Sequence, residues 1–291
     1  MKEPTVIALG FFDGLHLGHT ALVKKTVSRA GEYSCRALVV TFCTSPKAFV
    51  TGEQVPLLTT VEERTELLAE QYGVGVVALP FDEAMRKMPW REFLRGLKEN
   101  YGAVHLVAGH DYRFGYLNEG TPEKLQAFCR ENGLGCDIIP CVYRGGVAVS
   151  SRHIRALLSD GDVETANAFL GYRYTLCGEV VHGCARGAKE LFPTANLAVS
   201  REKLLPKEGV YATRAKLADG REYAAVTNIG SNPTVDGTRV SVESFLMDFA
   251  GDLYGQTLCI GFVRRLRDER KFESVAALKE QIARDLKEAK K

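Results

Sequence analysis

The chain has 291 residues, of which 45% are hydrophobic, so it is long enough and apolar enough to build two separate cores. Its 38 lysines and arginines nearly balance its 36 aspartates and glutamates, and the formal charge of +2 gives no indication of nucleic-acid binding. No apolar stretch is long enough to span a membrane and no signal-peptide pattern is present, so we expect a cytoplasmic protein without a membrane partner.

The first motif lies in the turn between a predicted strand at residues 5–9 and a predicted amphipathic helix at residues 20–30. This turn contains two histidines, His16 and His19, in the pattern His-Leu-Gly-His. Backbone N–H groups at the start of a helix favour anions, and two imidazoles add donors for negative charge that develops on a phosphate. The glycines let the backbone approach a ligand closely. The pattern therefore indicates a nucleotidyl-transfer site rather than a P-loop.

Two other interpretations of this turn stay open from the residues alone. The histidines could be satisfied polar groups of an ordinary strand–helix loop, whereas a zinc site is a poor alternative because no cysteine or carboxylate pair stands nearby. Asp13 could support the histidines from behind or could be a simple turn residue.

The rest of the first half alternates strand and helix patterns. We predict further strands at residues 35–42, 74–80, 104–108 and 137–139, with helices at 60–72, 89–100 and 122–132 between them. Such alternation is typical of an α/β domain with a doubly wound parallel sheet, in which ligands bind at the carboxyl ends of the strands. Residues 10–19 and 109–115 both follow predicted strands. The Gly-x-Gly-x-x-Ala pattern at residues 73–78 precedes a strand, so we do not interpret it as a dinucleotide fingerprint.

The second half changes character near residue 172, after a helical connection at residues 155–170. Short apolar runs at residues 176–181, 209–213, 223–228, 240–248 and 258–266 are separated by turn residues, which predicts an antiparallel sheet closed into a small barrel. A final helix at residues 274–287, capped by Ser274, completes the pattern. We therefore predict two domains, residues 1–170 and 171–291.

The eight cysteines contain no Cys-x-x-Cys pair and are scattered through strand-like and helix-like runs. This distribution predicts reduced, mostly buried thiols. Cys177, His182 and Cys184 lie close together in the sequence, but a zinc site there would lack a fourth ligand.

Taken together, the motifs of both halves resemble one known family. In the first half they are residues 12–19 (Phe-Asp-Gly-Leu-His-Leu-Gly-His), 111–115 (Asp-Tyr-Arg-Phe-Gly) and 150–155. In the second half they are residues 192–196 (Phe-Pro-Thr-Ala-Asn), 209–211, 228–234 and 248–255. In this order the motifs are similar to those of the bacterial bifunctional riboflavin kinase/FAD synthetases, from end to end of the chain.

The resemblance implies two in-line displacements with ATP as co-substrate. The barrel would transfer the γ-phosphate of ATP to the 5′-hydroxyl of riboflavin and give FMN. The first domain would let the FMN phosphate attack the α-phosphorus of a second ATP and give FAD and pyrophosphate. Positioning and charge stabilisation dominate such reactions.

The resemblance also assigns roles to residues of the first domain. His16 and His19 would bind the ATP phosphates and stabilise the adenylyl-transfer transition state. The resemblance further implies ATP or phosphate binding by a set of residues around them, with Arg155 able to hold two phosphate oxygens at once. This set comprises Gly10, Phe12, Gly18, Asp111, Ser151 and Arg155.

In the barrel, the resemblance implies that Thr194 and Asn196 bind Mg²⁺ and ATP phosphate, and that Glu243 is the base for the riboflavin hydroxyl. From the residues alone, residues 193–196 could equally be a strand-entry turn, and Glu243 a solvated strand residue. Alternation along residues 242–245 would point Glu243 and Phe245 to the same face of a strand.

Some positions depart from the family pattern: Phe11, Cys43 to Pro46, Arg152, Glu190 with Leu191, and Phe245. Three interpretations therefore remain. The first is a working bifunctional enzyme, the second an enzyme with one impaired domain, most readily the kinase, and the third a flavin or nucleotide sensor that keeps the fold without catalysis.

Overall fold

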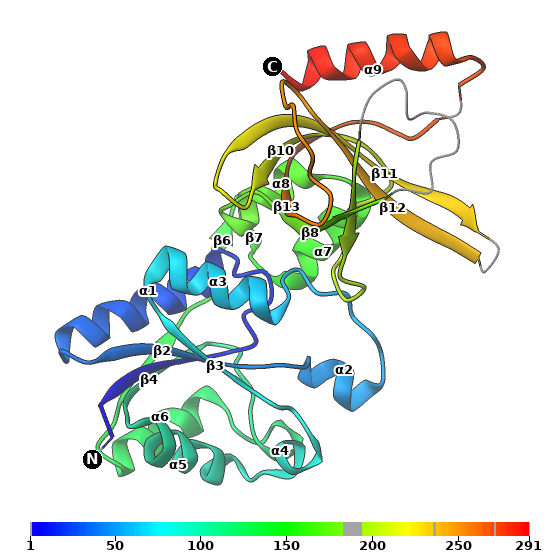
Figure 1. The fold of residues 1–291 in the computed structure, drawn as a ribbon. Helices are drawn as coiled ribbons and strands as arrows, with labels where there is room; N and C mark the ends of the chain where they lie inside the picture. The colour runs from blue at the N-terminus through cyan, green and yellow to red at the C-terminus, as the bar shows by residue number, and fades with distance from the viewer. Residues whose placement is uncertain (1, 183–193, 235–236, 271, 291) are drawn as a thin grey trace. The chain divides into compact units, whose positions relative to one another are not determined.

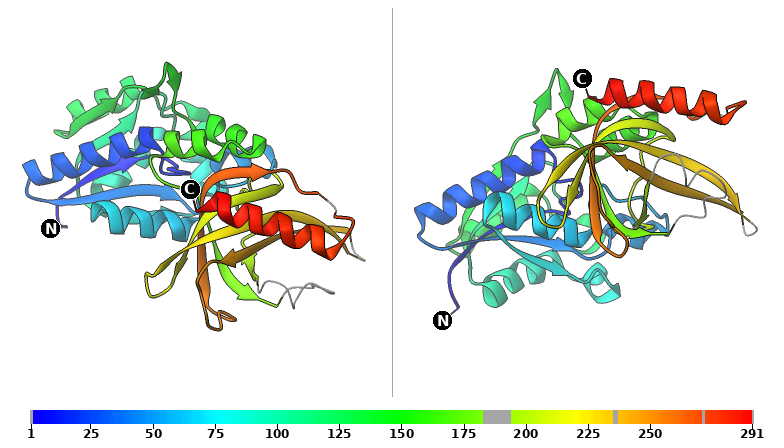
Figure 2. Two further views of the ribbon diagram at one scale, coloured as in Figure 1. Left: turned by 90° about the horizontal axis from the view of Figure 1, so that it is seen from above. Right: turned by 45° about the horizontal axis from the view of Figure 1, so that its top comes forward.

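A computed structural model describes residues 2–182, 194–234, 237–270 and 272–290. The chain divides into two compact units, Met1–Ser151 and Arg152–Lys291 (Figures 1 and 2). Within the described residues, every helix is too short or too polar to cross a lipid bilayer.

The first unit is built on a five-stranded parallel sheet with the strand order β3-β2-β1-β4-β5 (Figure 1). All four neighbouring pairs are parallel, as the alternation of strands and helices predicts. The strands are β1 (Thr5–Leu9), β2 (Arg36–Phe42), β3 (Gly75–Leu79), β4 (Ala103–Gly109) and β5 (Gly135–Ile139).

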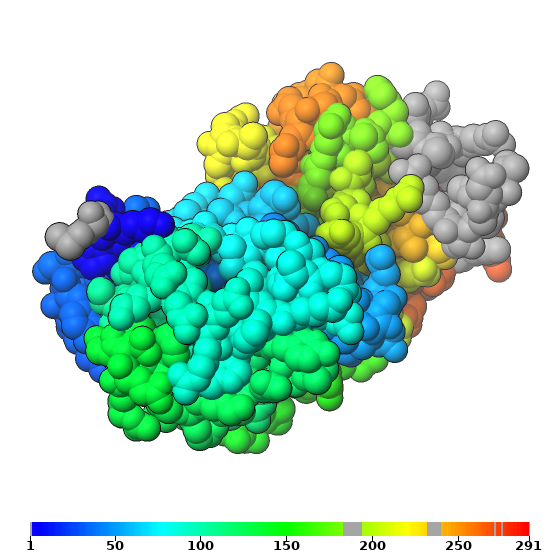
Figure 3. All heavy atoms as spheres, turned by 90° about the horizontal axis from the view of Figure 1, so that it is seen from below, coloured from blue at the N-terminus to red at the C-terminus, as the bar shows by residue number. Residues whose placement is uncertain are grey.

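Helices cover both faces of this sheet (Figure 1). The helices are α1 (Leu17–Glu32), α3 (Val61–Tyr72), α4 (Glu83–Lys87), α5 (Trp90–Tyr101) and α6 (Pro122–Glu131). Side chains of β1 alternate between the two faces. Val6 and Ala8 pack in one core with residues of α1 and α3. Ile7 and Leu9 pack in a second core with residues of α5 and α6. Figure 3 looks onto the second helical layer, where the cyan to green segments form the surface.

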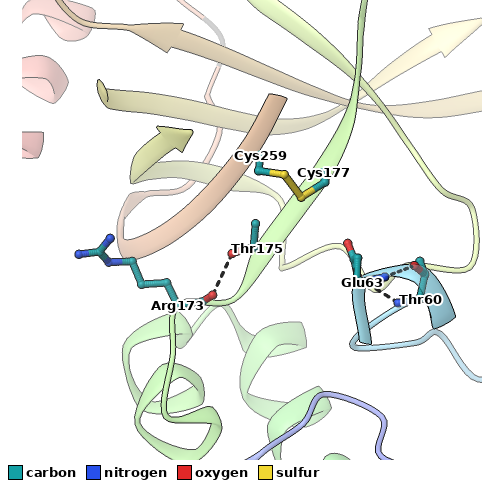
Figure 4. Close-up of a disulfide and its surroundings, with 6 residues drawn as sticks. All are labelled: Thr60, Glu63, Arg173, Thr175, Cys177 and Cys259. Carbon is teal, nitrogen blue, oxygen red and sulfur yellow. Dashed lines mark hydrogen bonds between the residues drawn. A yellow bond between two sulfur atoms is a disulfide. The ribbon is translucent and has the colours of Figure 1, made fainter. Parts of the chain in front are cut away.

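Both ends of α3 are fixed by local hydrogen bonding and backbone conformation. Thr60 and Glu63 form a reciprocal capping box, drawn in Figure 4, and Gly73 ends the helix in the left-handed region at φ 62°. Short elements were not predicted because they span too few residues to show a period. They are α2 (Pro46–Thr51), α4, the 3₁₀ helix η1 (Tyr116–Asn118), the hairpin of β6 (Tyr143–Arg144) and β7 (Val147–Ala148), and the barrel strand β9 (Ala195–Val199).

The second unit contains the predicted closed barrel, with the strand order β10-β11-β12-β9-β8-β13. Its last helix, α9 (Val275–Ala289), begins after Ser274, whose hydroxyl accepts a hydrogen bond from the Ala277 N–H at 3.1 Å, so the predicted cap is confirmed. The strands are β8 (Thr175–Val181), β9 (Ala195–Val199), β10 (Gly209–Leu217), β11 (Glu222–Thr234), β12 (Gly237–Leu246) and β13 (Thr257–Arg267).

The helices α7 (Ser151–Asp160) and α8 (Val163–Leu170) belong to this second unit from Arg152 onward, although the sequence pattern grouped them with the first domain. Asn167 explains the difference, because its amide donates to the Phe262 carbonyl on β13 at 2.8 Å and accepts from the Tyr174 N–H at 2.6 Å. Val163, Ala166 and Phe169 on α8 are also buried.

This packing predicts different stabilities for two fragments. Residues 152–291 should unfold cooperatively, whereas residues 171–291 should be several kcal/mol less stable, because burial of a large apolar side chain such as Val163 or Phe169 contributes roughly 1.5–3 kcal/mol. Urea unfolding followed by near-ultraviolet circular dichroism compares the two. Equal stability would show that α7 and α8 are dispensable to the barrel.

The cysteines correct one expectation. Cys177 on β8 stands opposite Cys259 on β13, and the two form a disulfide with Cα atoms 4.1 Å apart (Figure 4). The prediction of reduced thiols throughout is therefore wrong for this pair, because antiparallel register joins residues that are 82 positions apart in the sequence. Among the described free cysteines only Cys129 is fully buried, so the expectation of mostly buried thiols is also wrong.

Candidate functional site

The two predicted ligand-binding turns lie side by side in the first unit. β1 is hydrogen-bonded to β4, so residues 10–16 after β1 and residues 110–115 after β4 leave the same edge of the sheet. The chain runs from β1 outward to β2 and β3 on one side and from β4 to β5 on the other, which makes this the switch point of the sheet. The topology therefore places both turns where doubly wound sheets bind ligands.

His16 and His19 form a stacked pair at the start of α1. Their ring centroids are 3.7 Å apart with an interplanar angle of 10°, and His16 Nδ1 accepts a hydrogen bond from the His19 backbone N–H at 3.3 Å. This bond makes His16 the N-cap of α1 and, in the neutral ring, leaves the proton on Nε2. The imidazole donor therefore faces away from the helix that it caps.

His19 is held in its neutral form. Burial, followed by the nearby His16 and Arg64, lowers its pKa well below the usual value of 6.5. Its Nδ1 atom is buried and has no hydrogen-bond partner in the described part of the chain. Because buried polar atoms nearly always have partners, this atom marks a position for a ligand.

The lowered pKa of His19 predicts how stability varies with pH. The unfolded chain takes up the His19 proton near pH 6.5, whereas the folded chain takes it up only at lower pH. The folded state should therefore lose stability as the pH falls below about 6.5, and the loss should level off below the folded pKa. His105, whose pKa burial also lowers, contributes in the same direction.

Urea unfolding at pH 8 and pH 5.5 measures this effect. The His19→Gln variant should lose less stability than the parent between these two pH values. An equal loss in both proteins would contradict the assignment to His19.

Two buried charged residues, Asp13 and Arg64, fix the histidine turn by hydrogen bonds to backbone and side-chain groups around it. The Asp13 carboxylate accepts hydrogen bonds from the backbone N–H groups of Leu58 and Thr59 at 2.9 and 3.0 Å, so Asp13 ties the turn to the segment before α3. Arg64 is fully buried and donates to the Phe11 carbonyl and to Thr41 Oγ1, with its guanidinium 4.5 Å from the centre of the Phe11 ring. The aromatic residue at position 11 thus has a packing role.

The turns enclose a cavity of about 390 Å³, here called the histidine pocket. Most of the sequence-predicted residues line it: Gly10, His16, Gly18, His19, Asp111 and Ser151. A Cβ at Gly18 would lie 3.1 Å from the His16 ring, so a side chain there would press on the stack.

The remaining two predicted residues of this set differ. The Phe12 side chain is wholly buried in the core beside α1, so only its backbone could contact a ligand. Arg155 lies on α7 in the second unit, and its predicted role in phosphate binding stays a prediction. Ser151, at the start of α7, donates a hydrogen bond to the Asp13 carbonyl at 2.9 Å.

A second cavity, of about 480 Å³, adjoins the histidine pocket, and the sequence analysis missed it. The two cavities share Phe42, Pro46, Tyr112 and Arg113. We call it the aromatic pocket, because Phe42, Phe81, Phe93, Tyr112, Phe114 and Tyr116 line it. These residues come from distant segments, so no local spacing announces them, although residues 112–116 supply three of them. The pocket suits a flat, largely apolar ring system next to an anionic group.

In the barrel, strand register brings the predicted kinase residues together. Glu243 on β12 stands opposite Asn196 on β9, and Thr194 immediately precedes β9. Glu243 and Phe245 are half-buried and alternate with the buried residues Val242 and Ser244, as a shared face requires. The Glu243 carboxylate accepts a hydrogen bond from Ser241 Oγ at 3.1 Å.

A cavity of about 460 Å³, the barrel pocket, reaches Thr194 and Phe245, whereas Asn196 and Glu243 are not among the residues that line it. It is lined by Thr194, Ala195, Phe245, Leu246 and the segment 248–254. Of the family-pattern departures, Glu190 and Leu191 fall outside the described residues, as do Phe192 and Pro193 of the predicted motif.

The barrel offers oxygen donors but no acidic cluster for a metal ion among its described residues. Within the described residues no cluster of three His, Cys, Asp or Glu side chains could hold a metal ion. The Thr194 hydroxyl on the pocket wall and the Asn196 amide oxygen are neutral oxygen donors. Such a sparse set fits Mg²⁺, which keeps several waters and takes further oxygens from substrate phosphates.

Comparison with known proteins gives concordant matches along the chain. A family model for FAD synthetase matches residues 1–153, and a family model for riboflavin kinase matches residues 170–291. Bifunctional riboflavin kinase/FMN adenylyltransferases are 34% identical, from Bacillus subtilis over 99% of this chain and 92% of the relative, and from Escherichia coli K12 over 98% and 91%. The crystal structure of a macrolide-efflux protein from Streptococcus pneumoniae has a TM-score of 0.89 at 31% identity, covering 100% of this chain and 95% of that one.

Proposed function

The chain belongs to the family of bifunctional riboflavin kinase/FMN adenylyltransferases, and from this premise we propose how its two units divide the two reactions. The enzyme makes FMN from riboflavin and ATP, and FAD from FMN and ATP. We assign adenylyl transfer to the parallel-sheet unit and riboflavin phosphorylation to the barrel. The observation that carries this assignment is that the FAD synthetase model matches the first unit, the riboflavin kinase model matches residues 170–291 of the second, and each unit has a pocket of its own.

For adenylyl transfer, the ATP phosphates bind in the histidine pocket at the start of α1. An oxygen of the FMN phosphate forms a bond to the α-phosphorus of ATP, the bond from that phosphorus to the bridging oxygen breaks, and pyrophosphate leaves. The imidazoles of His16 and His19, of which His19 is kept neutral by burial, donate hydrogen bonds to the phosphate oxygens as negative charge develops on them. The isoalloxazine ring of FMN lies in the adjoining aromatic pocket.

For the kinase reaction, Glu243 takes the proton of the riboflavin 5′-hydroxyl as that oxygen bonds to the γ-phosphorus and ADP leaves. Thr194, on the wall of the barrel pocket, and Asn196, opposite Glu243, would hold Mg²⁺ and bind ATP phosphate. When bound, the metal ion neutralises charge on the phosphates. Because both reactions consume ATP, we place the enzyme in the cytoplasm.

One assay tests whether the protein carries out both reactions. Purified protein is incubated with ATP and Mg²⁺, once with riboflavin and once with FMN, and the flavins are separated. FAD from both substrates is the expected result. FAD from FMN alone would show an impaired kinase, and flavin binding without turnover would show a sensor.

A further inference from the structure

The side-chain amide oxygen of Asn228 in the barrel is buried but has no hydrogen-bond donor among the described residues. Asn228 lies on β11, and its Nδ2 donates a hydrogen bond to Glu269 Oε1 at 3.1 Å. Its Oδ1 atom is buried and accepts no hydrogen bond from the described part of the chain. A buried acceptor without a donor is costly, so the atom indicates a position that a ligand donor completes.

Glu269 decides which end of the amide is presented to a ligand. A carboxylate only accepts hydrogen bonds, so the nitrogen of Asn228 must face Glu269 and the oxygen must face away from it. Glu269 in turn lies against Gly230, where a Cβ would collide with the carboxylate. The glycine therefore leaves room for the group that orients the amide.

Strand register places this acceptor beside the proposed base. Asn228 stands directly opposite Glu243 in the β11–β12 pairing. Opposed residues of antiparallel strands point to the same face, with Cβ atoms about 4.5–5.5 Å apart. Both residues are half-buried and both are flanked along their strands by buried neighbours. Asn196, Glu243 and Asn228 thus form a polar row across three adjacent strands.

We propose that Asn228 accepts a hydrogen bond from a ribityl hydroxyl of riboflavin that neighbours the hydroxyl to be phosphorylated. This inference rests on the kinase function proposed above. The ribityl chain carries hydroxyl donors on consecutive carbons, so a side chain that binds one of them holds the next beside Glu243. Asn228 is then a specificity residue that favours a polyhydroxylated side chain over one that lacks the neighbouring hydroxyl.

The test compares riboflavin with its side-chain deoxy analogues, using flavin fluorescence for affinity and FMN formation for turnover, in the full chain. Asn228→Ala should weaken riboflavin binding and raise its KM about tenfold, the effect of one lost hydrogen bond, while the KM for ATP stays unchanged. In the parent, one deoxy analogue should bind about tenfold more weakly than riboflavin. In Asn228→Ala, the same analogue and riboflavin should bind with equal affinity, because the hydrogen bond is already lost. Ser231→Ala, on the same strand, is the matched control and should behave as the parent.

A second variant separates orientation of the amide from general damage to the barrel. Glu269→Ala should weaken riboflavin binding less than Asn228→Ala does, and it should add nothing when both changes are combined. Equal losses for riboflavin and every deoxy analogue, or unchanged riboflavin affinity in Asn228→Ala, would overturn the proposal. A parent chain that binds riboflavin but forms no FMN would contradict the kinase assignment instead, so the two failures are distinguishable.

Discussion

Replacement of His19 by alanine is expected to slow FAD formation from FMN and ATP by roughly 100-fold or more. The His19 ring stacks on His16 at the start of α1, and its buried Nδ1 has no hydrogen-bond partner among the described residues. This atom is therefore expected to form a strong hydrogen bond with a bound phosphate. The donor acts on charge that develops in the transition state, so kcat should fall far more than the affinity for ATP. Pyrophosphate release measured with supplied FMN gives the rate.

His16 allows a sharper version of the same experiment, because it also caps α1. His16→Ala should lose the cap and about 0.5–2 kcal/mol of stability along with the activity. His16→Asn retains a capping oxygen without an imidazole, so it should regain stability but not activity. Riboflavin phosphorylation, assigned to the barrel, serves as the internal control. Equal loss of both activities in a folded variant would refute the assignment of the histidines to adenylyl transfer.

Glu243→Gln is expected to lower riboflavin phosphorylation by roughly 100-fold or more. The amide keeps the shape of the side chain and can still hydrogen-bond, so riboflavin and ATP should bind nearly as well as in the parent. Only the base is removed from the row that Glu243 shares with Asn196 and Asn228. FMN formation at saturating substrates measures the effect, and FAD formation from supplied FMN should continue at the parent rate.

Glu179→Gln is a matched control, since Glu179 is an exposed glutamate on the barrel strand β8. The Glu179→Gln variant loses the same charge as Glu243→Gln, and it should phosphorylate riboflavin at the rate of the parent. Should Glu243→Gln phosphorylate riboflavin at the parent rate, Glu243 would be a structural residue of β12.

Local patterns in the sequence were sufficient for the fold class of both units and for their longer helices and strands. The apolar runs of the first half and the cap at Ser274 are decided by neighbouring residues, and each recurs in the structure. The histidine turn was also legible, because a strand, a glycine-containing turn and a helix are consecutive in the chain. Alternation of strands with helices was enough to predict the parallel sheet.

Properties that depend on partners distant in sequence were decided only by the tertiary structure. Strand register pairs Cys177 with Cys259 and aligns Asn196, Glu243 and Asn228, and no spacing along the chain encodes register between separate strands. The aromatic pocket gathers side chains from segments between Phe42 and Tyr116. The role of Asp13 was open in the sequence, because a turn residue and a buried acceptor look alike until the N–H groups of Leu58 and Thr59 are brought to it. Sequence determined the elements because their signals are local, whereas the sites required the packing that joins residues far apart in the chain.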